Sequence, residues 1–77
     1  IAHDNVIKDG CHLAPGVSLG SNINLSENCV IGIGSSISTG VSIGENSIVS
    51  VGSSVTSNVE NNSIIEGVPA KVIGKSK

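Results

Sequence analysis

The chain has 77 residues, a formal net charge of −2 and no Phe, Tyr, Trp or Met. A chain of this length forms one domain at most and buries only about 60% of its unfolded surface, so we expect it to self-associate. The acidic balance argues against a nucleic-acid partner, and single-stranded nucleic acids would also need aromatic stacking platforms. No apolar run approaches the roughly 18 residues of a membrane span, and no secretory signal is visible. We therefore expect a cytoplasmic protein with no membrane partner.

An aliphatic residue occurs at every sixth position from Ile1 to Val55. The positions are Ile1, Ile7, Leu13, Leu19, Leu25, Ile31, Ile37, Ile43, Val49 and Val55. Three residues after each of them stand Asp4, Gly10, Gly16, Asn22, Asn28, Gly34, Gly40, Asn46, Gly52 and Asn58. Gly and Asn tolerate positive φ at tight turns. Neither a helix nor a hairpin has this period, so the repeat predicts a hexapeptide solenoid with one inward aliphatic side chain and one left-handed corner per short strand.

Three hexapeptides make one coil of a three-sided prism, so residues 1–60 are predicted to form about three coils of an all-β, parallel solenoid. Inward columns are expected from Leu13, Ile31 and Val49, and from Leu25 and Ile43. Small or apolar residues are expected to fill the interior corners: Cys11, Val17, Ile23, Cys29, Ser35, Val41, Ser47, Ser53 and Val59. Residues 61–77 break the period and are predicted to form a C-terminal loop and basic tail: Asn61-Asn62 predicts a turn, residues 63–66 a short extended stretch and residues 67–70 a loop before the tail.

The outward positions distinguish the three faces of the prism. One face is acidic and carries Asp9, Glu27 and Glu45. A second face is polar and carries His3, Ser21, Thr39 and Ser57. The third carries an apolar strip made of Val30, Ile33, Ile48 and Val51, with His12 and Pro15 at one end. An outward apolar strip on a small protein predicts a subunit interface, with or without a ligand groove beside it.

Cys11 and Cys29 are placed to stack in neighbouring coils, about 4.8 Å apart. A disulfide between them is geometrically conceivable. We favour two buried thiols that act as small hydrophobic residues in a cytosolic protein.

Few residues could carry chemistry. His3 is followed by Asp4, the one corner residue that is neither Gly nor Asn. A carboxylate can orient a histidine ring and raise its basicity, which suits a general base; an exposed histidine beside an ordinary turn aspartate is the alternative. His12 is the other histidine, and two histidines are too few for a metal site within one chain. Three of the four basic residues, Lys71 among them, lie in the last seven positions, as a solvated tail or a phosphate contact.

Two stretches are narrower signals than the repeat itself. They are HDNVIKDGCHLAPG, from His3 to Gly16, and GVPAK, from Gly67 to Lys71. On these residues the chain resembles the C-terminal half of hexapeptide-repeat acyltransferases, in particular the bacterial sialic acid O-acetyltransferase and nucleotide-amino-sugar N-acetyltransferase family. The resemblance implies a left-handed parallel β-helix, a homotrimer, and acetyl-CoA bound between neighbouring prisms. It also implies an N-terminal α/β domain, which has no counterpart in these residues.

The resemblance assigns roles to individual residues. The catalytic base of the family falls on His3 and its acidic neighbour on Asp4. The histidine that contacts acetyl-CoA near its thioester falls on His12. Ser21 stands where the family has a glycine beside the thioester, so only its backbone N–H can take over that role.

The resemblance also places the coenzyme. Its contacts further along the solenoid fall on Ile33 and Val51. A long, thin pantetheine arm would suit small residues such as Gly32, where we expect a bulky side chain to block the groove and leave the interior stacking intact. The anionic phosphates would then lie towards Lys71.

These observations predict an acetyl-CoA-dependent acetyltransferase that acts on the amine or hydroxyl of a small-molecule sugar acceptor, with no metal expected. Two alternatives stay open. A non-catalytic solenoid, such as a scaffold or an ice-binding protein, would on this fold favour a threonine array, for which the chain has only Thr39 and Thr56. A zinc enzyme of the γ-carbonic-anhydrase kind would need three histidines gathered across a subunit seam.

Overall fold

The computed structural model describes residues 4–76. All secondary-structure elements in this range are β-strands. Nine two-residue strands recur at six-residue intervals. They are β1 (Val6–Ile7), β2 (His12–Leu13), β3 (Ser18–Leu19), β4 (Asn24–Leu25), β5 (Val30–Ile31), β6 (Ser36–Ile37), β7 (Ser42–Ile43), β8 (Ile48–Val49) and β9 (Ser54–Val55). Two longer strands follow, β10 (Ser63–Gly67) and β11 (Ala70–Lys75). No helix able to cross a membrane occurs among residues 4–76.

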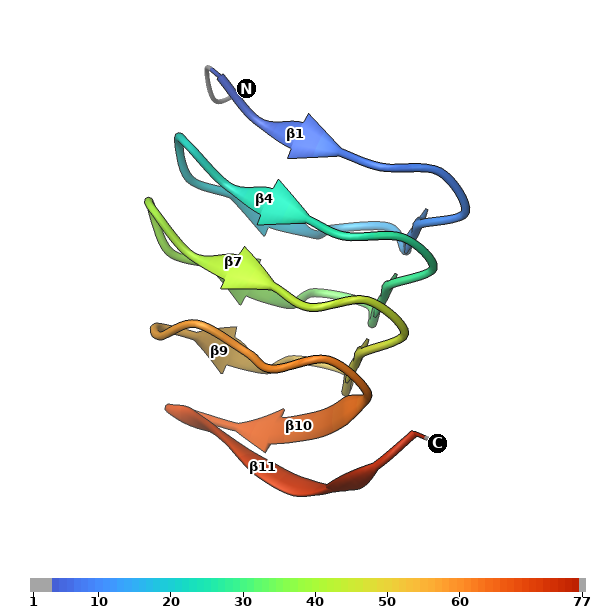
Figure 1. Ribbon diagram of the computed structural model, residues 1–77. Coiled ribbons are helices and arrows are strands. Elements are labelled where there is room, and N and C mark those ends of the chain that lie inside the picture. Colours follow the sequence, from blue (N-terminus) through green and yellow to red (C-terminus); the bar gives the residue numbers. More distant parts are fainter. Residues whose placement is uncertain (1–3, 77) are drawn as a thin grey trace.

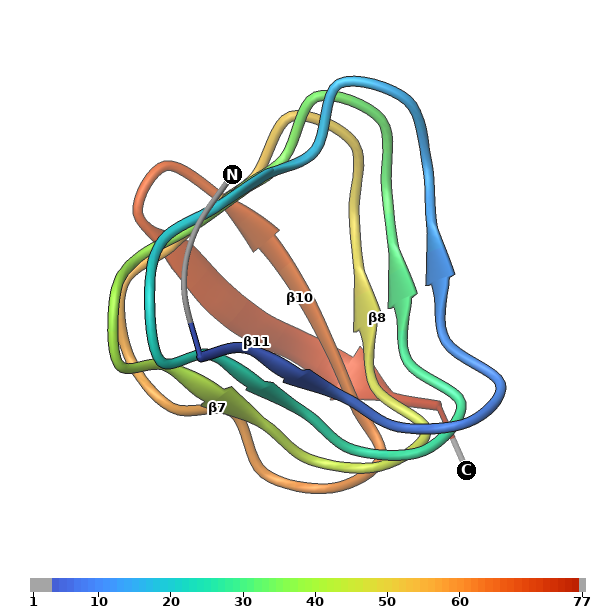
Figure 2. The same cartoon turned by 90° about the horizontal axis from the view of Figure 1, so that it is seen from above.

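Three sheets form the faces of a triangular prism (Figure 2). Their strand orders are β1-β4-β7, β2-β5-β8-β10-β11 and β3-β6-β9. Strands β1 to β6 each pair in parallel with the strand one coil further on, as His12 does with Val30 and Val30 with Ile48. Seen from the N-terminal end, the chain winds counterclockwise as it recedes, so the coil is left-handed (Figures 1 and 2). The predicted parallel β-helix of about three coils is confirmed.

The corners adopt the predicted left-handed backbone. Positive φ angles between 57° and 83° occur at nine of the ten predicted positions, from Asp4 to Gly52. Successive corners are linked along the axis, because the Gly34 N–H donates to the Pro15 carbonyl at 3.1 Å and the Gly52 N–H to the Ile33 carbonyl at 2.8 Å. The Gly and Asn residues therefore form turns, and most of these turns are joined to the turn of the next coil by a backbone hydrogen bond.

Asn58 is the exception, and its prediction as a left-handed corner is wrong. Val59 pairs with Ile43 and Ile65 with Val49, so the last coil spans 16 residues instead of 18. The coil is shortened at the corner that Asn58 would have formed. The Asn58 Oδ1 there accepts a 2.9 Å bond from the Ser42 N–H. The Asn58 side chain thus accepts the hydrogen bond from Ser42 at the place where the shortened coil lacks two residues.

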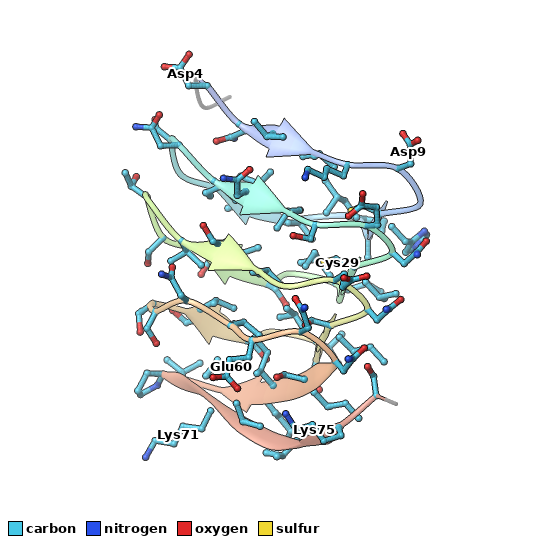
Figure 3. All side chains as sticks on the ribbon, viewed as in Figure 1. Asp4, Asp9, Cys29, Glu60, Lys71 and Lys75 are labelled. Atoms are coloured by element: carbon cyan, nitrogen blue, oxygen red, sulfur yellow. The ribbon has the colours of Figure 1, made fainter. Side chains whose placement is uncertain are left out.

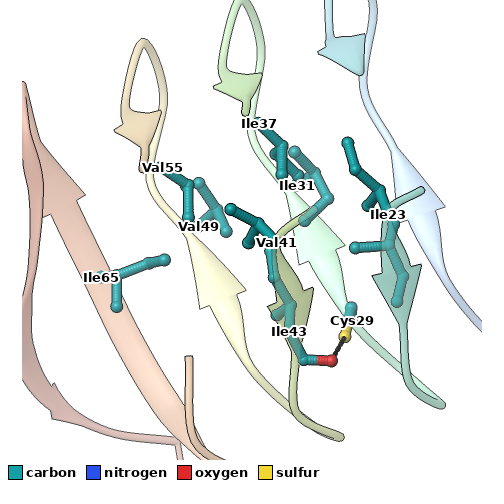
Figure 4. Close-up of a cluster of buried hydrophobic side chains, with 10 residues drawn as sticks. Ile23, Cys29, Ile31, Ile37, Val41, Ile43, Val49, Val55 and Ile65 are labelled. Carbon is teal, nitrogen blue, oxygen red and sulfur yellow. Dashed lines mark hydrogen bonds between the residues drawn. The ribbon is translucent and has the colours of Figure 1, made fainter. Parts of the chain in front are cut away.

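Buried aliphatic side chains form the centre of the interior (Figure 4), and Cys29 and small serines are buried with them. Leu25, Ile31, Ile43 and Val49 are all at most 1% exposed, which confirms the two predicted inward columns. Leu13 belongs to the same column as Ile31, but it is 37% exposed. The reason is its place in the first coil, on whose outer end no other part of residues 4–76 packs.

The turn predicted at Asn61-Asn62 and the extended stretch predicted for residues 63–66 are confirmed, but the residues predicted as a basic tail form a strand. β10 pairs in parallel with β8, and β11 folds back antiparallel on β10. The turn between them contains Gly67, with a φ of 110°, and Pro69. Lys71 and Lys75 therefore lie on an ordered edge strand at the C-terminal end of the prism (Figure 3).

Gly32 is needed for the stacking of the coils. A Cβ atom on this residue would lie 2.7 Å from the Val51 amide nitrogen and 2.9 Å from the Ser50 carbonyl carbon. Backbone atoms cannot yield as a flexible side chain can. The expectation that a bulky residue at Gly32 leaves the interior stacking intact is therefore wrong.

Gly34 offers a clean test of the corner geometry, since its φ is 70° and an added Cβ would meet no atom within 4 Å. We expect Gly34→Ala to lower the free energy of unfolding by about 1–2 kcal/mol, the cost of a left-handed residue. Gly34→Asn should cost less, because Asn22, Asn28 and Asn46 occupy equivalent corners. Urea unfolding measures both, and equal losses would contradict this account.

At Gly32 the order should reverse. Gly32→Ala should cost about 1–3 kcal/mol through overpacking, and Gly32→Asn should cost more, since the larger side chain meets the same Val51 backbone. The same urea experiment provides the measurement. An Asn variant as stable as the Ala variant would show that steric contact does not dominate at this position.

Candidate functional site

The apolar strip lies on the outer surface of one prism face. Val30 and Ile48 pair in register on β5 and β8, and Ile64 of β10 continues their column. Ile33 and Val51 are the most exposed members of the strip, at 58% and 67%. The predicted outward orientation of the strip is therefore confirmed for the single chain.

Corner stacking explains why these side chains point outward together. Pro15, Ile33 and Val51 each precede a corner glycine, and the bonds between successive corners hold the three residues above one another along the axis. His12 heads the neighbouring column, because it pairs with Val30 in the first two coils. The result is two parallel rows of side chains, one headed by His12 and the other by Pro15.

Asp4 occupies the first described corner, where it is exposed and has a φ of 60°. His3, the predicted catalytic base, lies outside the described residues. Figure 3 shows Asp4 at one end of the prism and Lys71 at the other. Asp4 and Ser21 stand at one corner of the prism, whereas Pro15, Ile33 and Val51 stand at another. In a single chain the predicted site residues are therefore distributed both along the axis and around it, and are not gathered at one point.

Asn5 is a residue of this region that the sequence analysis missed. Its Nδ2 donates to the Gly20 carbonyl at 3.1 Å, and its Oδ1 accepts from the Ile23 N–H at 2.9 Å. The side chain therefore ties the backbone directly after Asp4 to the second coil. The sequence does mark this residue: Asn5 is polar, whereas the equivalent residues of the next two coils, Ile23 and Val41, are apolar.

Ser21 is half-buried, and its backbone N–H is already engaged. The Thr39 hydroxyl accepts a 3.1 Å bond from it. Thr39 also stands against Gly20, where an added Cβ would lie 2.5 Å from the Thr39 Oγ1. A ligand that uses the Ser21 N–H must therefore share this donor with Thr39 or displace its hydroxyl.

Metal-ligating side chains do not gather in the described part of the chain. Residues 4–76 contain no group of three or more His, Cys, Asp or Glu side chains placed to hold a metal ion. A three-histidine zinc centre would therefore have to draw ligands from His3 or from neighbouring chains.

The chain is similar in sequence and fold to several known proteins. Residues 27–57 match the family described as the hexapeptide repeat of succinyl-transferase. A search of curated proteins found no match. Among solved structures, the chain is similar to a mutant of perosamine N-acetyltransferase from Caulobacter crescentus in complex with CoA and GDP-perosamine. The TM-score is 0.94 and the identity 31%, over 97% of this chain and 36% of that one.

Two further structures are similar over nearly the whole chain. A maltose O-acetyltransferase from Clostridium difficile 630 has a TM-score of 0.90 and 27% identity, over 95% of this chain and 49% of that one. A galactoside acetyltransferase in complex with coenzyme A has a TM-score of 0.90 and 29% identity, over 95% of this chain and 46% of that one. The chain thus spans about a third to a half of the length of these enzymes. The chain shares its hexapeptide repeat and its β-helix fold with these enzymes.

Proposed function

We propose that this chain is the β-helix domain of an acetyltransferase that moves an acetyl group from acetyl-CoA to the amine or hydroxyl of a sugar. The similarity to perosamine N-acetyltransferase in complex with CoA and GDP-perosamine supports this proposal most strongly, because it extends over 97% of the chain. The acceptors named for the similar enzymes are an amino sugar linked to a nucleotide, maltose and a galactoside. These acceptors are all sugars or sugar derivatives. Sialic acid as the acceptor stays a prediction.

His3 is the proposed general base. Its imidazole would take the proton of the acceptor amine or hydroxyl as that group attacks the thioester carbonyl, and would return a proton to the departing thiolate of CoA. Asp4 would hold the ring in the basic tautomer. The two similar structures of perosamine N-acetyltransferase mutants both carry a substitution of one histidine, which supports a central role for a histidine in that enzyme.

Backbone N–H groups would stabilise the oxyanion of the tetrahedral intermediate. Ser21 is the candidate donor, provided that its N–H is shared with or released by Thr39. The thioester is already activated, so no covalent bond to the protein is needed. Positioning and proton transfer are then the whole of the catalytic task.

The proposed coenzyme site follows the apolar strip. His12 stands at the end near Asp4, so the thioester would lie there, while Ile33 and Val51 would contact the pantetheine arm. Lys71, on the exposed edge strand β11 at the far end, would meet the phosphates. Gly32 lies between the two rows of side chains, but the space beside it is filled by the Ser50 and Val51 backbone of the next coil.

A homotrimer is part of the proposal. Val30, Ile33, Ile48 and Val51 are between 36% and 67% exposed in the single chain, and apolar side chains exposed to this degree in one strip favour a covering partner. A neighbouring prism would bury part of the strip and close a groove over the rest. The cytoplasmic location likewise stays a prediction.

The catalytic role is tested by kinetics on the protein in its full length. We expect His3→Ala to lower kcat by about 100-fold or more, the usual scale for a general base. The KM for acetyl-CoA should change little, because the base acts on the acceptor. Asp4→Asn should cost less, and Asp9→Asn, a carboxylate beside the next corner, is the matched control with normal turnover. Wild-type turnover in His3→Ala would refute the assignment.

Assembly is tested by analytical ultracentrifugation at micromolar concentration. We expect a trimer for the wild type and a shift to smaller species for Val51→Glu, because a charge would be buried against the neighbouring prism. Ser36→Glu, on the outward side of β6, is the matched control and should stay trimeric. A monodisperse wild-type monomer would contradict the proposed interface.

A further inference from the structure

One interior corner of the prism holds a vertical stack of Cys11, Cys29, Ser47 and Ser63. The residues that follow them pair in register from coil to coil, as His12 does with Val30, Val30 with Ile48 and Ile48 with Ile64. Cys29, Ser47 and Ser63 are buried, whereas Cys11 is half-buried. The two thiols are thus adjoining members of one stack.

The upper three members make the same hydrogen bond. The Cys11 Sγ donates to the Ser26 carbonyl at 3.1 Å and the Cys29 Sγ to the Gly44 carbonyl at 3.2 Å. The Ser47 Oγ donates to the Glu60 carbonyl at 3.0 Å. A hydroxyl therefore does the same structural work as a thiol in this stack. The hydrogen bond alone therefore does not account for the presence of two thiols in this stack.

The geometry brings the two cysteines within bonding range. The His12 N–H donates to the Cys29 carbonyl at 2.8 Å, so the backbones of the two coils are in direct contact at this corner. Adjacent strands lie about 4.8 Å apart, and disulfides join residues whose Cα atoms are about 4.4–6.8 Å apart. Both thiols are free. We propose that Cys11 and Cys29 form a reversible disulfide, an oxidation site that ties the first coil to the second.

A low-molecular-weight disulfide, such as oxidised glutathione, is the proposed oxidant. The Cys11 thiolate attacks one sulfur of it, and the S–S bond breaks to leave Cys11 as a mixed disulfide and one glutathione thiolate. The Cys29 thiol then loses its proton and attacks the Cys11 sulfur, which releases the second glutathione. Two protein thiols are oxidised and one glutathione disulfide is reduced to two thiols, so electrons and protons balance.

Exposure decides the order of these steps. Within residues 4–76 Cys11 is half-buried, whereas Cys29 is fully buried. Burial and the neighbouring Cys11 raise the pKa of Cys29 to about 11, so it is protonated at neutral pH and a poor first nucleophile. Cys29 is therefore the resolving thiol, which reacts once the mixed disulfide stands beside it.

The bond would tie the coil of β2 to the coil of β5, two strands that already pair in register. A cross-link between Cys11 and Cys29 removes conformations from the unfolded chain and holds the two coils together. We expect the melting temperature of the oxidised chain to rise by several degrees, about the scale of a single disulfide in a small domain.

The test oxidises the full chain with oxidised glutathione and maps the product by mass spectrometry. We expect a loss of two hydrogen atoms and no glutathione adduct. Cleavage after Glu27, which lies between the two cysteines, should leave two peptides joined until a reductant is added. A product that carries only glutathione adducts, or a disulfide between two chains, would overturn the proposal.

A relocated thiol provides the matched control. The double variant Cys29→Ser, Ser47→Cys keeps two thiols in the same stack but places them two coils apart, beyond the reach of a disulfide. It should give the glutathione adduct at Cys11 and no joined peptides, with an unchanged circular dichroism spectrum. Joined peptides from this variant would show that the bond forms in unfolded chains, and they would overturn the proposal. These readouts involve no acetyl transfer, so they are independent of the proposed function.

Discussion

The whole structure depends on the contact between successive coils. Backbone amides of one coil donate to carbonyls of the next at close to 3 Å, as Val6 does to Ile23 at 2.8 Å and Ala14 to Ile31 at 3.0 Å. The interior has room for one layer of aliphatic side chains, so nearly every residue is either inside a column, at a corner or on the outer surface. Three rules follow: aliphatic residues inward, Gly or Asn at the corners, and no side chain where the coils touch at Gly32.

The same contact creates the candidate site. Each outward side chain lies above its equivalent in the next coil, so a change of residue type in one column produces a strip along the axis. One face thereby becomes apolar through Val30, Ile33, Ile48 and Val51, while β3, β6 and β9 present Ser18, Ser36 and Ser54 in register. A long, narrow ligand such as coenzyme A is better matched to a strip than to a compact pocket. This is why a fold with no cleft in its interior can still carry a coenzyme site.

Much of the fold could be predicted from the sequence, because the six-residue period and the Gly and Asn residues at the corners are directly visible in it. The handedness came from the resemblance to known acyltransferases and not from the repeat. Three features escaped prediction for physical reasons. Asn58 has the right residue type for a corner, but the two-residue shortening of the last coil shows only in the pairing of Val59 and Ile65. The clamp made by Asn5 and the bond from Ser21 to Thr39 depend on side-chain contacts between coils, which a period in the sequence does not specify.

The most direct measurement is hydrogen exchange of the backbone amides with and without CoA, on the protein in its full length. The account predicts protection at Gly32, Ile33 and Val51, on the apolar face between the two rows of side chains. It predicts no change at Ser18, Ser36 and Ser54, which lie on a different face of the same coils. Protection of the serine face, or no protection of any amide, would contradict the assignment of the coenzyme site.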